Sequence, residues 1–100
     1  MNEQIKKKWV KALRSGEYEQ TKDALHLDGG YCCLGVLAAI ATGAHGDGIY
    51  KTDVVSVFGG RLSVAYRNEI GLSEEDENQL ISMNDEGCTF DQIAYCVEQL

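Results

Sequence analysis

Proline does not occur anywhere in the 100-residue sequence, which excludes a proline-rich linker or recognition segment. Low-complexity tracts and internal repeats are also missing. Helix and loop boundaries must therefore be read from capping residues and from the eleven glycines. Hydrophobic residues make up 44% of the chain and charged residues 25%, which are ordinary globular values, so we expect residues 1–100 to form a single domain.

Long hydrophobic runs are scarce as well. The longest, residues 31–41, is about half the length of a membrane-spanning helix, and no signal-peptide pattern opens the sequence. We therefore expect a cytoplasmic protein with no membrane partner. In that reducing compartment the four cysteines should remain free thiols.

Positive charge is depleted toward the end of the chain. Residues 61–100 carry two Lys/Arg against nine Asp/Glu, whereas residues 1–30 carry six against five and contain the basic cluster Lys6, Lys7, Lys8 and Lys11. The net charge of −7 argues against duplex nucleic acid as a partner, because phosphate binding needs a basic face.

The acidic residues gather mainly at positions 74–77, with Asp85, Glu86 and Asp91. This surface could imitate nucleic acid toward a basic partner protein. The run at 74–77 is equally explained by the dipole of the helix that it opens, which favours negative charge in the first turn.

Apolar spacing and caps predict a mainly helical α+β domain, with four to five helices around a buried central helix. Ile5, Trp9 and Leu13 recur every four residues after an Asn2 cap, which predicts a helix over residues 3–14. Residues 32–42 are small and apolar on all sides, which predicts the central helix. Further helices are predicted over 62–70, from Ser73, and from Thr89, which forms a capping box with Gln92.

A small β-hairpin or short sheet is predicted to accompany these helices. Residues 24–27 could form a short strand before a turn at residues 28–30, and the β-branched run at 54–58 predicts a strand or hairpin. The expected core residues are Trp9, Leu13, Leu34, Leu37, Ile40, Leu80, Phe90, Ile93 and Val97.

Cys32 and Cys33 stand at the start of the predicted central helix, where the dipole can lower a thiol pKa. A papain-like hydrolase would pair one of them with His26 or His45 and an orienting residue such as Asp85 or Asn84. Buried cysteines need no chemistry to explain them, so we assign no catalytic residue and do not expect an enzyme. The cysteine spacing also does not match a zinc site, so we expect no metal or cofactor.

Anion recognition is the better-supported chemistry. The turn at residues 28–30 comes just before the predicted central helix, and the N–H groups of a helix start can bind phosphate. Arg14, Lys22 and Arg61 could add positive charge, Tyr18 a stacking face and Gln20 an amide.

Three segments together resemble a family of small, mostly uncharacterised bacteriophage and prophage proteins. They are Trp9-x2-Ala12-Leu13-Arg14-Ser15-Gly16-x-Tyr18-x-Gln20, Tyr31-Cys32-Cys33-Leu34-Gly35-Val36-Leu37 and Met83-Asn84-Asp85-x-Gly87-x2-Phe90-x2-Ile93-Ala94. The resemblance implies a phage accessory protein in the host bacterial cytosol, and such proteins often antagonise host defence. It also draws attention to Asn84 and Asp85, which have no obvious packing role.

The leading hypothesis is a phage-encoded binding protein that sequesters a small nucleotide-derived immune signal. The predicted ligand-binding residues are Arg14, Tyr18, Gln20, Gly30, Tyr31, Arg61, Asn84 and Asp85. One alternative is an acidic, anti-CRISPR-like inhibitor that binds a host defence protein, and the other is the cysteine hydrolase. A homo-oligomer is compatible with all three.

Overall fold

Local capping groups begin four of the helices in the computed structural model, which describes residues 1–100. Asn2, Ser63, Ser73 and Thr89 each accept a hydrogen bond from the backbone N–H three residues later. The elements in chain order are α1 (Glu3–Arg14), β1 (His26–Leu27), β2 (Gly30–Tyr31), α2 (Cys33–Thr42), the 3-10 helix η1 (Gly46–Lys51), α3 (Val64–Ile70), α4 (Glu74–Asp85) and α5 (Phe90–Glu98). The predicted mainly helical α+β fold with a small sheet is confirmed.

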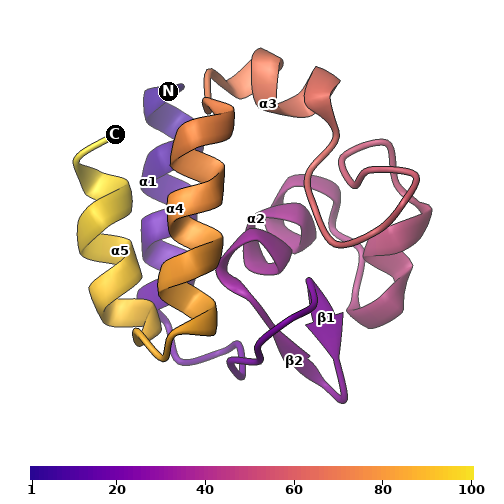
Figure 1. Cartoon of the computed structure of the whole chain (residues 1–100), viewed down its shortest axis with the longest axis horizontal. Coiled ribbons are helices and arrows are strands. Elements are labelled where there is room, and N and C mark those ends of the chain that lie inside the picture. The colour runs from indigo at the N-terminus through magenta and orange to yellow at the C-terminus, as the bar shows by residue number, and fades with distance from the viewer.

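Three helices, α1, α4 and α5, lie side by side on one side of the molecule, and α2 lies between them and the hairpin (Figure 1). α1 packs against α5 and α2, and α2 packs against α4. The two short strands pair antiparallel, with His26 opposite Tyr31 and Leu27 opposite Gly30. No helix of the structure is long and apolar enough to cross a membrane.

α2 is the centre of the core, as predicted. Its residues from Cys33 to Ala39 are all buried. Trp9 of α1 is 0% exposed, and its indole N–H donates to the Cys33 carbonyl at 2.9 Å. Of the nine expected core residues only Ile40 is not fully buried, because the last turn of α2 emerges at the surface.

The hairpin brings Leu25 against α2 at Gly35. A Cβ built on Gly35 would lie only 1.9 Å from the Leu25 carbonyl oxygen, so no larger residue fits there. The Leu25 carbonyl also accepts a hydrogen bond from the Cys32 N–H at 3.1 Å. The start of α2 is thus fixed to the segment that precedes the sheet.

Residues 54–58, predicted as a strand or hairpin, form no regular strand but one side of a short hairpin. This segment makes only an isolated antiparallel bridge, between Val55 and Leu62. Beyond the bridge the chain turns at once: the Gly59 N–H donates to the Ser56 carbonyl, and Gly59 and Gly60 have left-handed φ values of 73° and 81°. The predicted strand at 24–27 is limited to His26–Leu27, and the 3-10 helix η1 was not predicted.

Candidate functional site

The largest hollow on the molecule, about 670 Å³, lies between α1 and α5. We call it the α1–α5 groove. Its lining residues are Glu3, Lys6, Lys7, Val10, Lys11, Arg14, Ser15 and Glu98. Those of α1 recur at intervals of three and four residues and therefore share a broad face of the helix, next to the stripe that buries Trp9 and Leu13.

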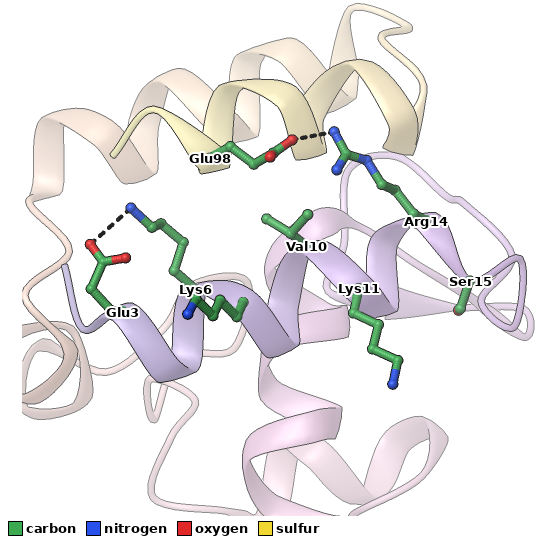
Figure 2. A pocket seen from close by; sticks show the side chains of 8 residues that line it. Glu3, Lys6, Val10, Lys11, Arg14, Ser15 and Glu98 are labelled. Atoms are coloured by element: carbon green, nitrogen blue, oxygen red, sulfur yellow. Dashed lines mark hydrogen bonds and ion pairs between the residues drawn. The ribbon is translucent and has the colours of Figure 1, made fainter.

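An ion pair stands at each end of the α1–α5 groove (Figure 2). Arg14 pairs with Glu98 of α5, and Lys6 pairs with Glu3 at 3.1 Å. The Lys6 ammonium also donates to the Leu100 carbonyl at 3.2 Å, and its hydrogen bond to Glu3 lowers the pKa of that carboxyl. Lys7 and Lys11 form no ion pair, and the Lys11 side chain extends away from α5.

The groove is the basic part of an acidic molecule. Four cations and two carboxylates line it, whereas the rest of the chain holds five cations and fourteen carboxylates. Three of these cations, Lys6, Lys7 and Lys11, belong to the basic cluster noted in the sequence but were not among the predicted site residues. The helical spacing of Lys7, Lys11 and Arg14 is the signal that could have joined them.

Of the predicted site residues, Arg14 lies in the groove, and most of the others form a separate polar cluster at the start of α2. Tyr18 packs edge-on against Tyr31, with ring centroids 5.3 Å apart, and burial raises the pKa of the Tyr18 hydroxyl. The Tyr31 hydroxyl accepts from the Gly46 N–H at 2.7 Å. Gly30 is buried, and a Cβ on it would lie 2.9 Å from the Thr21 side chain. The side chains of Tyr18 and Tyr31 are thus engaged in contacts within the protein.

Asn84 is the centre of this cluster. It is 0% exposed; its Oδ1 accepts from the Cys33 N–H at 3.2 Å and from Gln20 Nε2 at 3.0 Å, and its Nδ2 donates to the Thr21 carbonyl at 2.7 Å. Asp85 accepts from the Asp23 N–H at 3.0 Å. The expectation that open N–H groups line the start of α2 is therefore wrong there, because the Asn84 side chain occupies the Cys33 N–H.

Arg61 lies elsewhere, beside the first half of α4. Its guanidinium donates to Asn78 and pairs with Glu77 at 3.0 Å, and Arg67 approaches the same Glu77 oxygen at 3.4 Å. Glu77 is 1% exposed and also accepts from the Leu62 N–H at 3.2 Å. Glu77 is consequently not part of the acidic surface expected at residues 74–77.

The paired thiols lie beneath the surface. Cys32 is 6% exposed and Cys33 0%. Burial raises the pKa of Cys32 to about 11, an effect that Asp85 adds to, and it raises the pKa of Cys33 well above its ordinary value. His26 hydrogen-bonds to Asp47 at 2.8 Å. With these raised pKa values both thiols are protonated at neutral pH. No three His, Cys, Asp or Glu side chains converge in a cluster that could hold a metal ion.

The chain was compared with protein families, curated proteins and solved structures. The family model described as "Domain of unknown function (DUF8296)" matches residues 1–58, which run from α1 through η1. No curated protein and no solved structure matches the chain. The matched part includes the cation-bearing face of α1 and, at the start of α2, Cys32 and Cys33. It does not include α4 or α5.

Proposed function

The chain belongs to the DUF8296 family of domains of unknown function, and we propose that it is a binding protein that holds a phosphate-bearing, nucleotide-derived ligand in the α1–α5 groove. The observation that carries this proposal is the grouping of Lys6, Lys7, Lys11 and Arg14 around one hollow of an otherwise acidic molecule. Its volume of about 670 Å³ lies within the range usual for small-ligand sites.

The ion pairs at the ends of the groove can be exchanged for ligand contacts. Arg14 and Glu98 are both about 43% exposed, so a phosphate group could replace the Glu98 carboxylate on the guanidinium. Lys7 and Lys11 are exposed and have no carboxylate to give up. Val10 supplies a small apolar floor.

Long-range repulsion does not exclude an anionic ligand. Fields from charges elsewhere in the molecule are screened beyond about 10 Å at 0.1 M salt, whereas the cations of the groove act at contact distance. The ligand is bound and not converted in this proposal, since the thiols are protonated and are not in the groove.

The biological role that we propose is antagonism of a bacterial defence system. It rests on the resemblance of the sequence to small phage proteins and on the use of nucleotide-derived signals by such systems. A protein that only holds the signal lowers its free concentration in proportion to the number of protein copies.

Isothermal titration calorimetry with cyclic dinucleotides, cyclic ADP-ribose isomers and pyrophosphate tests the proposal. The variant Lys7→Glu/Lys11→Glu should bind at least about tenfold more weakly than the natural chain. The matched control is Lys22→Glu/Lys51→Glu, which changes the net charge equally at exposed lysines outside the groove. The absence of heat with every compound, or an equal loss in both variants, would reject the groove as the site.

A second candidate function uses the acidic end of α4 against a basic protein. Glu74 and Glu75 are exposed and form no ion pair, so they are free to meet a cationic partner. Reversing the charges of Glu74, Glu75 and Asp76 should abolish inhibition of a host effector if this surface acts. If that triple variant inhibits normally, the acidic end of α4 is only solvated.

A further inference from the structure

Two exposed apolar side chains lie in the middle of the loop between η1 and α3. Val57 and Phe58 are 95% and 96% exposed, and we call them the apolar tip. Two adjacent apolar side chains that are almost fully exposed are unfavourable in water unless a partner covers them. The tip therefore indicates an interaction surface.

An apolar hollow of about 480 Å³ lies on the same chain, where α1, α2 and α3 meet. We call it the α2 hollow. Most of its wall is formed by Ile5, Leu37, Ile40, Val54, Tyr66 and Ile70, whereas Asn2, Lys8 and Glu69 add polar groups. The hollow has room for a valine and a phenylalanine side chain and contains no ion pair.

Backbone hydrogen bonds fix the base of the loop that carries the apolar tip. The Ser63 N–H donates to the Val54 carbonyl at 2.7 Å, and the Ser56 N–H donates to the Arg61 carbonyl at 2.9 Å. These bonds and the bridge between Val55 and Leu62 hold the loop as a short hairpin. In this conformation the tip is exposed and does not line the hollow, so a second molecule is needed to cover both.

We propose that the chain forms a two-fold dimer in which the apolar tip of each copy enters the α2 hollow of the other. One symmetry operation then makes the same contact twice, because each chain carries both the tip and the hollow. An aromatic side chain buries about 150–250 Å². Two tips and two hollows together bury on the order of 1,000 Å², which is near the lower limit for a specific interface.

Sedimentation equilibrium of the natural chain and of two variants tests this dimer. Phe58→Ser removes the tip, and Ala41→Glu places a carboxylate in the hollow, where Ala41 is exposed. The natural chain should approach twice its mass of 11.0 kDa at about 0.1 mM, and each variant should associate at least about tenfold more weakly. The matched controls, Tyr95→Ser and Ala65→Glu, alter exposed residues outside both features and should dimerise normally.

Mixing the two variants gives a sharper result. Phe58→Ser keeps an intact hollow and Ala41→Glu keeps an intact tip, so the mixture should form a heterodimer through one of the two contacts. Circular dichroism must show that both variants are folded. A Phe58→Ser variant that dimerises as the natural chain does would overturn the proposal. A natural chain that stays at 11.0 kDa would also overturn it and would leave the tip to a different apolar partner.

Discussion

Asn84 shows how one buried amide can hold several segments together. It joins the start of α2, the Thr21 backbone and the Gln20 side chain. Replacing Asn84 by Ala leaves the Cys33 N–H and the Thr21 carbonyl without partners, which should lower the free energy of unfolding by about 2–4 kcal/mol. Urea denaturation measures the change.

A suitable control for Asn84 is Asn68→Ala, because Asn68 is exposed on α3. That substitution should change the free energy of unfolding by no more than about 0.5 kcal/mol. Equal losses in the two variants would mean that the Asn84 hydrogen bonds contribute nothing particular to stability.

The Cys32 thiol gives the fold a dependence on alkaline pH. Its pKa is raised by burial to about 11 from an ordinary value of 9.0, so the folded state holds the proton more tightly than the unfolded state. The stabilisation is complete below pH 9 and is lost as the pH rises from 9 to 11, by about 3 kcal/mol in total. Chemical denaturation across this range should show the decline.

Cys32→Ala separates this effect from other alkaline effects, because it removes one thiol and leaves Cys33 in place. The variant should lose less stability than the natural chain between pH 9 and pH 11. Parallel stability curves for the two proteins would contradict the role of the Cys32 thiol.

The structural role of Asn84 could not have been predicted from the sequence. The partners of Asn84 are 51 and 64 residues away in the chain, at Cys33 and Gln20. Unusual polar residues without a packing role are as consistent with ligand binding as with buried hydrogen bonding. Only the tertiary contact distinguishes the two.

At the scale of the element, helix starts were predictable because capping is local. Ser63, Ser73 and Thr89 each bond to an N–H within their own first turn, so the sequence holds the whole interaction. For the run at residues 54–58 the sequence left a strand and a hairpin open, because a strand depends on a paired neighbour. Only the pair Val55 and Leu62 meets before the glycine turn.

Gly35 in the middle of α2 reverses the usual rule for helices. Replacing an interior glycine by alanine normally stabilises a helix by about 1 kcal/mol. Here the added methyl group would overlap the Leu25 carbonyl at 1.9 Å, so Gly35→Ala should destabilise the protein by at least about 3 kcal/mol. Thermal unfolding followed by circular dichroism measures the effect.

The control for Gly35 is Gly48→Ala in η1. A Cβ on Gly48 would lie 3.7 Å from the Ala44 side chain, an ordinary contact, and should be tolerated within about 1 kcal/mol. A Gly35→Ala variant as stable as Gly48→Ala would show that α2 can move away from Leu25 at little cost.

For the whole molecule, charge distribution was visible in the sequence but its geometry was not. The basic cluster in the first thirty residues was evident, and Arg14 was selected for its charge. Glu98 of the partner helix α5, which closes the groove, comes 84 residues after Arg14 and could not be placed beside it. The candidate site was therefore predicted only in part.

The two proposed interactions should respond to salt in opposite directions. Raising the salt concentration from about 0.05 M to about 0.5 M weakens contacts between an anion and the groove cations, and it also screens the repulsion between two copies that each carry −7. Pyrophosphate binding should weaken and dimerisation should strengthen. Calorimetry and sedimentation equilibrium at matched salt concentrations check this, and a shared direction would contradict at least one proposal.

The indole bound to the Cys33 carbonyl offers a built-in optical reporter. Trp9 is the only tryptophan in the chain, and it lies where α1 packs against α2. Its emission wavelength should shift to the red when α1 separates from α2, because the ring then meets water. Fluorescence can thus follow the integrity of the central packing in every variant described above, without an attached dye.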